Sequence, residues 1–402
     1  MKYNYRLVCI ITLIFLSCHN ENTTISYDVK GQNINNIISL EPENSSEILA
    51  GQIYHQLHYI PLETNSNSLL DERHVVKIID NKIGILNINQ SNFILFDEDG
   101  NFIFSIGSTG QHPGNLSSTY DFTIFEKKIY FPSHSNKSFI IYDIYGEYVE
   151  SVYVENSYKK LLRTDDFITA TTKNLPDRYN SSNDNVAFYN EKLIKILNFG
   201  TVPKHLEYID LYDIVYKSYN KNEIIYHQIL SDTIFRINSE GEITYDLIKN
   251  NPPFSIDEID KGLTFNMQNG LFDKYMNNPN ATFPIRNIFD SKNYLILFYM
   301  YNYQHYITIH SKSYGRSKTF HFDSDDIRNH VFHPSMDFTA LDNTMLIETS
   351  IQNFRNVVNL LPEDYLASSN FDVIMNDPNL DENSNPILVT YRLNDDYIDS
   401  LF

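Results

Sequence analysis

Short runs of apolar residues recur in pairs along most of the chain, and a polar turn separates the two runs of each pair. Residues 92–107 (NFILFDEDGNFIFSIG) and 138–153 (SFIIYDIYGEYVESVY) show the pattern. In both, an apolar run leads into a turn that ends in Gly, and a second β-rich run follows. An Asp or Asn at the start of such a turn and a Gly in the left-handed conformation suit a tight hairpin. The pattern therefore predicts β-hairpins.

Four further segments repeat this hairpin pattern, at residues 185–200, 233–248, 306–322 and 387–402. The turn positions are expected at Gly100, Gly146, Lys192, Gly241, Gly315 and near Asn394. The first three spacings are 46, 46 and 49 residues, which match the period of about 40–50 residues of a four-stranded propeller blade. The last two, of 74 and 79 residues, indicate partly helical insertions around 250–283 and 351–384. Lys192 stands where a turn glycine would be expected.

A second pair of β segments precedes each hairpin, for example HVVKIID (74–80) with KIGILNI (82–88), so each repeat is expected to hold four strands. Runs such as FILF and FIIY are apolar throughout, which is typical of strands that are covered on both faces. An open stack of such sheets would leave an apolar face and an unpaired edge at each end. The chain is therefore predicted to be all-β, a six-bladed β-propeller with four-stranded blades.

The last repeat leaves too little chain for a complete outer strand. The N-terminal segment QLHYIPLE (56–63) is expected to supply that strand and to lock the first blade to the last. Pro61 suits this role, because proline is tolerated on an edge strand and not in a central one.

Three of the 13 glycines lie in one loop, GSTGQHPGNLSSTYDF (107–122). Gly107, Gly110 and Gly114 are expected to provide positive-φ turns, and Pro113 a rigid one, where the chain passes from an outer strand to the next inner strand. A β-strand follows this loop where a phosphate-binding loop would need a helix, so that reading is excluded.

The chain has 31 basic and 51 acidic residues, a formal net charge of -20. Such a chain repels phosphate backbones and anionic lipids, so nucleic acid is not an expected partner. Solubility alone also explains the acid excess. Cys9 and Cys18 are the only cysteines, which excludes a disulfide or Cys-metal framework from the folded body.

The N-terminus has the pattern of an export signal. Lys2 and Arg6 precede an apolar stretch from Leu7 to Leu16 that is too short to span a bilayer. The following FLSC resembles a bacterial lipobox, in which Cys18 would carry a diacylglycerol; in an ordinary signal peptide Cys18 would be incidental. The expected organisation is a signal peptide (1–17), a tether (18–36) and the propeller (37–402). Several acyl chains on one residue would hold the protein on a membrane, its only expected membrane contact.

The stretch from 104 to 149 resembles an NHL-type repeat, with G-x-x-G-x-x-P-G, a D-F inner strand, I-Y-F and a Y-D-x-x-G turn. The wider chain from about residue 37 is similar to six-bladed β-propeller lipoproteins of Bacteroidetes, through LHYIPLET, SDTIFRINSEGEI and SNPILVTYRL. The resemblance implies the fold and a secreted setting. With the lipobox, the expected location is the cell envelope, as an outer-membrane lipoprotein that is either periplasmic or surface-exposed. It implies no activity, because propellers carry many unrelated functions.

No metal or catalytic motif stands out. DEDGN (97–101) looks like a calcium loop, but its EF-hand register would place Leu95 and Ile106 at ligand positions. Neither H-E-x-x-H nor G-x-S-x-G occurs. We expect no cofactor. Calcium in the channel is the alternative, because other six-bladed propellers hold calcium through oxygen ligands at inner-strand ends. The acidic residues near such ends, which turn capping also explains, are Asp121, Asp165, Asp166 and Asp210.

Loops between blades and loops between the second and third strands are expected to meet on one face around the channel. Their amide, imidazole, guanidinium and phenol groups suit a polar ligand such as a glycan or a peptide, although hydrophilic loops need no ligand. The candidate ligand-binding residues are Gln111, His112, Asp121, His134, Asn136, Arg178, His227, Gln228, Arg286, Tyr303, Gln304 and His333.

The preferred hypothesis is a non-enzymatic ligand-binding or scaffolding propeller, anchored to the cell envelope, that binds a glycan, a peptide or a partner protein. The alternative is a calcium-dependent, lactonase-like hydrolase or lyase with its site in the central channel. That enzyme would need at least three oxygen or imidazole ligands converging in the channel.

Overall fold

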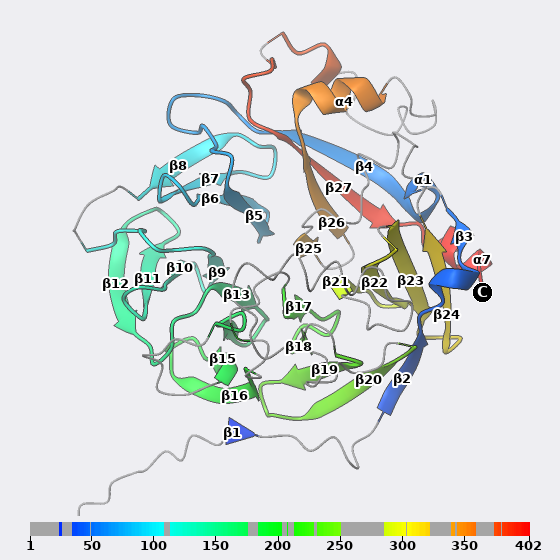
Figure 1. Cartoon of the computed structure of the whole chain (residues 1–402). Helices are drawn as coiled ribbons and strands as arrows, with labels where there is room; N and C mark the ends of the chain where they lie inside the picture. The colour runs from blue at the N-terminus through cyan, green and yellow to red at the C-terminus, as the bar shows by residue number, and fades with distance from the viewer. Residues whose placement is uncertain are drawn as a thin grey trace, which may run out of the picture.

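The strands form six separate sheets that surround a central axis (Figure 1). The computed structural model describes residues 24–25, 34–48, 50–107, 113–175, 184–202, 207, 213–228, 231–250, 285–302, 304–321, 339–341, 344–358, 374–378 and 380–402. The sheets follow one another around the ring as the blades of a propeller, which confirms the predicted six-bladed, all-β fold. Within the described ranges, no helix has the length and apolar character needed to cross a membrane.

The first three blades each use four consecutive antiparallel strands. Blade 1 consists of β5 (His74–Ile79), β6 (Lys82–Asn87), β7 (Asn92–Phe96) and β8 (Phe102–Ile106). Blade 2 consists of β9 (Thr123–Phe125), β10 (Lys128–Ser133), β11 (Ser138–Asp143) and β12 (Tyr148–Tyr153). Blade 3 consists of β13 (Lys160–Arg163), β14 (Ile168–Thr171), β15 (Asp184–Tyr189) and β16 (Lys195–Thr201).

Blades 4 and 5 repeat this arrangement, and blade 6 departs from it. Blade 4 consists of β17 (Val215–Lys217), β18 (Glu223–His227), β19 (Thr233–Asn238) and β20 (Ile243–Lys249). Blade 5 consists of β21 (Ile285–Asp290), β22 (Tyr294–Tyr301), β23 (Gln304–Ser311) and β24 (Arg316–His321). Blade 6 consists of β25 (Thr339–Leu341), β26 (Thr344–Thr349), β27 (Ile387–Leu393) and β4 (Tyr54–Pro61).

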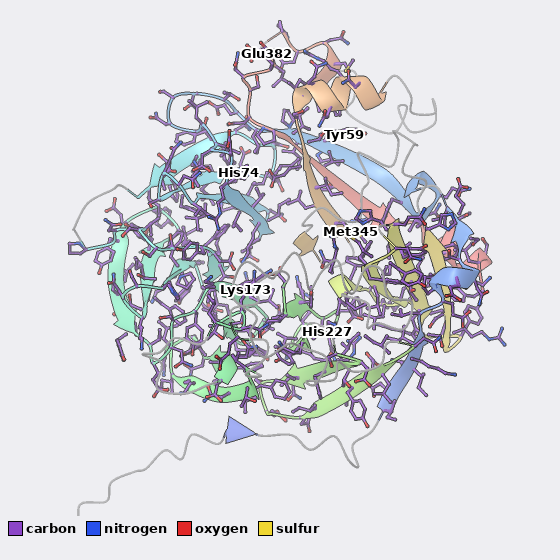
Figure 2. The ribbon with its side chains drawn as sticks, in the orientation of Figure 1. Tyr59, His74, Lys173, His227, Met345 and Glu382 are labelled. Carbon is purple, nitrogen blue, oxygen red and sulfur yellow. The ribbon has the colours of Figure 1, made fainter. Side chains whose placement is uncertain are left out.

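The strand from the N-terminus closes the ring. In β4, Pro61 pairs with Ile387 and Tyr54 with Leu393, so the N-terminal strand forms the outer edge of the last blade. Tyr59 of β4 is buried in the same core cluster as Met345 of β26, and both are labelled in Figure 2. The predicted closure through 56–63 is therefore confirmed, including the position of Pro61 on an edge strand.

The core is divided into six apolar clusters, and each one fills the space between two neighbouring blades. Between blades 1 and 2, Phe93 packs edge-on against Phe122 and Phe131, with ring centroids 4.9 and 5.3 Å away. All eight residues of β22 are buried. Strands covered on both faces bury side chains that point either way, which explains their uniformly apolar sequences.

The chain ahead of β4 runs along the outer edges of three blades. β1 (Thr24–Ile25), β2 (Ile34–Ser39) and β3 (Ser46–Glu47) add parallel strands to β16, β20 and β24, respectively (Figure 1). We call these three strands the strap. Part of the segment assigned to a tether thus lies hydrogen-bonded to the propeller rim. In the described part of the chain, β8 and β12 receive no such strand.

Two details of the predicted hairpins are wrong. In blade 3 the left-handed turn residue is Leu193, with φ of 57°, and not its neighbour Lys192. After β27 the chain forms the helix α7 (Asp395–Ser400) where a second strand was expected, because Asn394 caps the helix by accepting a hydrogen bond from the amide of Tyr397.

The predicted loop glycines and insertions are partly described. Gly107 and Gly114 have φ of 99° and 85°, as predicted, whereas Gly110 lies outside the described residues. The second insertion contains the helix α4 (Ile351–Val358). Residues 251–283, nearly all of the first insertion, lie outside the described residues.

A buried ionic cluster joins blades 4 and 5. The Arg236 guanidinium donates to Asp290 at 2.9 and 3.0 Å and to Asp246 at 3.1 Å. Burial raises the pKa of Asp290, but the charge and hydrogen bonds of Arg236 and of Lys312 outweigh it and lower the pKa to about 2. Each buried charge therefore has an opposite charge beside it, as a stable interior requires.

Candidate functional site: the central channel

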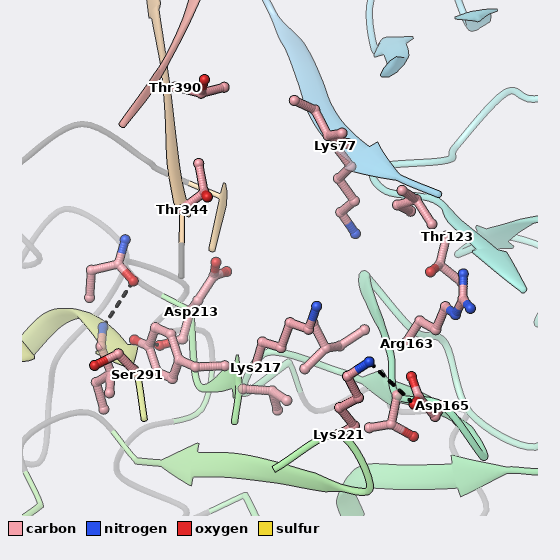
Figure 3. A pocket seen from close by; sticks show the side chains of 18 of the residues that line it. Lys77, Thr123, Arg163, Asp165, Asp213, Lys217, Lys221, Ser291, Thr344 and Thr390 are labelled. Atoms are coloured by element: carbon pink, nitrogen blue, oxygen red, sulfur yellow. Dashed lines mark hydrogen bonds and ion pairs between the residues drawn. The ribbon is translucent and has the colours of Figure 1, made fainter. Parts of the chain in front are cut away.

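A cavity of about 930 Å³ lies among the inner strands of the ring. Residues of the inner strands β5, β13, β17 and β21 line it, together with Thr123 of blade 2 and with residues of β26 and β27 in blade 6, such as Thr344 and Thr390 (Figure 3). The lining also includes turns that join first and second strands, through Asp80, Asp165 and Lys221. The cavity thus extends along the channel to the end where these turns lie.

Basic residues outnumber acidic ones in the described lining, although the whole chain has 31 basic and 51 acidic residues. The seven basic residues are Lys77, Lys160, Arg163, Lys217, Lys221, Lys292 and Arg392. The five acidic residues are Asp80, Asp165, Asp213, Asp395 and Asp396. The described lining therefore has two more basic than acidic residues, although Asp121, which pairs with Lys77, lies just behind it.

Lys77 connects the inner strands of three consecutive blades. Its ammonium lies 2.7 Å from the Asp121 carboxylate and donates to the carbonyl oxygens of Phe122 and Leu161 at 2.7 and 2.8 Å. The same carboxylate accepts the amide of Leu161 at 2.7 Å. Burial lowers the pKa of Lys77, and the neighbouring charge of Asp121 opposes that change. This contact fastens the channel wall and already satisfies the Asp121 carboxylate with an ammonium.

Several other charged residues of the lining form ion pairs with one another. Arg163 lies 2.6 Å from Asp80, and Lys160 pairs with Asp213. Lys221 approaches Asp165 only to 4.0 Å, and both side chains are more than half exposed.

Two basic residues of the lining differ from these. Among the residues that the structure describes, no carboxylate lies within 4.0 Å of Lys292 or Arg392, and both are exposed. The lining therefore contains two cations that form no ion pair with an acid in the described part of the chain.

None of the described sequence-predicted binding residues lines this cavity. His134 and Asn136 lie between β10 and β11, and Gln304 begins β23, so they belong to loops between second and third strands. Because strands alternate in direction, those loops lie at the opposite end of the blade from the turns between first and second strands. The predicted loop face and the charged end of the cavity are therefore on opposite sides of the ring.

Two predicted residues sit together at the end of β18. His227 is buried, its Nδ1 lies 3.2 Å from the carbonyl oxygen of Thr233, and burial lowers its pKa to about 4. Gln228 donates to Asn174 at 2.9 Å and accepts the Tyr226 hydroxyl at 2.7 Å. This amide network ties blade 3 to blade 4, and its groups already have protein partners.

The remaining predicted residues are scattered. Arg286 is half-buried in β21, and Asp121 belongs to the Lys77 contact. Gln111, His112, Arg178, Tyr303 and His333 lie outside the described residues, as do Asp210 and Cys18.

The described residues include no group of three His, Cys, Asp or Glu side chains placed to hold a metal ion. Of the acidic residues named for calcium, Asp121 contacts Lys77, and Asp165 and Asp166 are exposed.

The sequence interpretation missed the basic lining residues. Their signal was a Lys or Arg within or just after an inner strand, as in HVVKIID, KKLLRTDD and DIVYKSYN. One such residue in a strand is unremarkable, and only the ring brings several of them to one axis.

A comparison with protein families shows which family this chain belongs to. Residues 20–392 match a family described as a domain of unknown function, DUF4934. The chain belongs to the DUF4934 family. The comparison with curated proteins found no match.

A solved structure supports the fold, and two others show weaker similarity. A Bacteroides fragilis protein described as exported is 17% identical, with a TM-score of 0.66, and the match covers 89% of this chain and 99% of that one. A DUF4221 member from Bacteroides vulgatus is 12% identical over 85% of this chain and 97% of its own, with a TM-score of 0.49. Virginiamycin B lyase from Staphylococcus aureus is 13% identical over 72% and 94%, but its TM-score of 0.38 is too low to support an inference about activity.

Proposed function

We propose that this DUF4934 protein is a non-enzymatic binding propeller of the cell envelope, with its ligand site in the central channel. The observation that supports this most directly is the cavity of about 930 Å³ lined by side chains from the inner strands. Ligand sites typically occupy about 300–1,000 Å³ and combine a formed concave shape with a few convergent polar groups. A glycan, a peptide or an extended segment of a partner protein could present polar groups to such a wall.

The channel also suits binding because contacts between blades hold its wall in a formed shape. Lys77, Asp121 and Leu161 interlock three blades at the axis, and apolar clusters fill the spaces between blades. A preformed wall loses little conformational freedom when a ligand binds. Loops that must first become ordered would bind less tightly for the same contacts.

The test is a glycan and peptide array screen of residues 22–402, followed by two paired variants. Lys160→Ala with Asp213→Ala removes one charge of each sign from the channel wall, so its net charge is unchanged, although Asp213 also lies 3.6 Å from Lys173. His134→Ala with Gln304→Ala changes the predicted loop face instead. We expect the channel pair to weaken binding at least about tenfold and the loop pair to leave it unchanged. Loss of binding in the loop pair alone would move the site to the other face.

The enzymatic alternative, a calcium-dependent lactonase-like hydrolase or lyase, is tested by thermal unfolding. A reversible rise in melting temperature when calcium is added after EDTA treatment would favour it and count against the binding proposal.

We further propose that Cys18 carries the lipid that holds the protein at the outer membrane. The lipobox-like FLSC and the exported Bacteroides fragilis relative support this proposal. Cys18→Ala should move the protein from the membrane fraction to the soluble fraction, and retention of the variant on the membrane would contradict lipidation.

A further inference from the structure

We infer that the channel selects anionic ligands, specifically a small molecule with two or more carboxylate, sulfate or phosphate groups. The inference rests on the proposed binding function and names its ligand class. It comes from the cavity wall, which seven basic and five acidic residues line in a chain whose net charge is -20, and where Lys292 and Arg392 have no described acidic residue within 4.0 Å.

The overall negative charge does not prevent an anion from binding inside the ring. At physiological ionic strength, exposed charges are screened beyond about 8 Å, so the nearest side chains dominate the potential that a bound ligand meets. The apolar blade interfaces behind the wall are a medium of low dielectric constant, which strengthens the field of the lining cations within the cavity.

Three of the basic residues are placed to meet a ligand. We call Lys221, Lys292 and Arg392 the cationic rim; they belong to blades 4, 5 and 6 and all line the cavity. Lys292 and Arg392 have no acidic neighbour within 4.0 Å among the described residues. The contact of Lys221 with Asp165 is long and exposed, and such pairs contribute little, so an anion can replace it.

Hydrogen bonds to neighbouring segments fix the backbone near each residue of the cationic rim. The amide of Asp165 donates to the carbonyl oxygen of Lys221 at 3.1 Å, which joins the turns of blades 3 and 4. The hydroxyl of Tyr294, two residues after Lys292, donates to the carbonyl oxygen of Asp395 at 3.2 Å, close in sequence to Arg392. Asp395 and Asp396, two of the five acidic residues of the lining, lie at this end of the cavity.

The chemistry of these side chains specifies the ligand. A guanidinium forms paired hydrogen bonds with a carboxylate, sulfate or phosphate group, and an ammonium adds a compact charge beside it. Cations on successive blades can contact separate anionic groups of one molecule. A large polyanion such as nucleic acid would instead meet the negative outer surface, which favours a small ligand enclosed by the channel.

Four probes separate the sources of the charge. Trigalacturonate carries carboxylates, a heparin disaccharide carries sulfates, inositol hexakisphosphate carries phosphates, and maltotriose is a neutral match for the first. Calorimetric titration of residues 22–402 should detect at least one anionic probe and not maltotriose. Binding should weaken as ionic strength rises to about 0.15 M, because screening acts on this attraction.

Matched variants test the rim itself. Lys292→Gln with Arg392→Gln should lower the affinity for the anionic probe at least about tenfold and reduce the salt dependence of its binding. Lys192→Gln removes one positive charge from an exposed turn of blade 3 outside the cavity and should change neither.

The inference on anions is overturned if no anionic probe binds at about 1 mM, or if the rim variants bind as the parent does. Equal weakening by Lys192→Gln would also overturn it, because the effect would then be general charge attraction. A different result would separate the two proposals: only maltotriose or array glycans bind, and the Lys160→Ala and Asp213→Ala pair abolishes that binding. The proposed binding function would then stand, and the inference of an anionic ligand would be wrong.

Discussion

In blades 1 to 4, the turn between the third and fourth strands depends on two residues three positions apart. The first is Asp97, Asp143, Asn190 or Asn238, whose side-chain oxygen accepts the amides two and four residues later. The fourth residue is left-handed: it is Gly in three of these turns, and Leu193 in blade 3. The Asx residue therefore sets the register of the turn, which explains why a search for glycine alone misplaced it by one residue.

Gly100 gives a prediction at this scale, because its turn packs against the closing strand β4. A Cβ at Gly100 would lie 2.3 Å from the carbonyl oxygen of Pro61, whereas one at Gly315 would meet nothing within 4 Å. Both have positive φ, so Gly315→Ala should cost about 1 kcal/mol for the left-handed backbone alone. Gly100→Ala should cost on the order of 3 kcal/mol in chemical denaturation, since β4 must also move. Equal costs would show that the contact with Pro61 is not a constraint.

At the scale of the element, the strap and β4 contribute differently to stability. The strap adds strands to blades that are already complete, and exposed side chains such as Ile34 and Ile37 show that much of it remains at the surface. β4 instead completes a blade and buries Tyr54 and Tyr59 in the cluster between blades 5 and 6. Since a blade without its outer strand leaves an apolar face and an open edge, β4 should be essential to the fold.

Two truncations test this difference. Removal of residues 1–33 deletes β1 but keeps β2, β3 and β4, and should preserve a cooperative thermal transition. Removal of residues 1–63 deletes β2, β3 and β4 as well and should abolish that transition, because β27 loses its outer partner along its whole length while it keeps β26 on the other side. A cooperative transition in the shorter protein at the parental temperature would contradict this assignment of β4.

At the scale of the whole molecule, the ring is also closed by a charged contact. His74 of blade 1 places Nε2 2.6 Å from the Glu348 carboxylate of blade 6, and Nδ1 2.6 Å from the carbonyl oxygen of Asp71. Burial lowers the pKa of His74, but the hydrogen bond and charge of Glu348, with the Asp71 carbonyl, raise it overall. The protonated ring can donate to both acceptors at once, so its charge stabilises the closed ring.

The sign of this shift predicts the pH dependence of stability. Because the pKa of His74 is raised in the folded state, its protonation stabilises the fold fully at pH values below the unfolded pKa of about 6.5. This stabilisation disappears as the pH rises through the folded pKa. Glu348→Gln should therefore lower the melting temperature more at about pH 5.5 than at about pH 8.5. Glu191→Gln, at an exposed turn of blade 3, is the control and should show no such difference. An effect of Glu348→Gln that is independent of pH would refute the charged contact.

Much of the fold was predictable because its signals are local. Hairpins such as 92–106 and 138–153 depend on an Asx residue, a left-handed residue and apolar strands within about 15 residues of each other. The closure by 56–63 followed from counting the strands of the last blade. The helix α7 was missed because its apolar residues resemble those of a short strand, and the cap at Asn394 decided in favour of the helix.

The candidate site was less predictable. Lys77, Asp121 and Leu161 meet at the axis although 84 residues separate the first from the last. The repeats also do not place fully equivalent residues in the lining, since Lys77 lies two residues before the end of β5, whereas Arg163 and Lys217 are the last residues of β13 and β17. No local pattern distinguishes such a lysine from one that faces solvent.

The sequence by itself determined the repeat, the strands, the turns and the number of blades, because neighbouring residues decide hairpin geometry and a doubly covered strand must be apolar along its length. Only the tertiary structure decided which side chains share the channel, how the strap follows the outer edges of the blades, and that basic residues gather inside an acidic molecule. Those properties arise from closing the ring, which brings one short inner strand of each blade to a common axis.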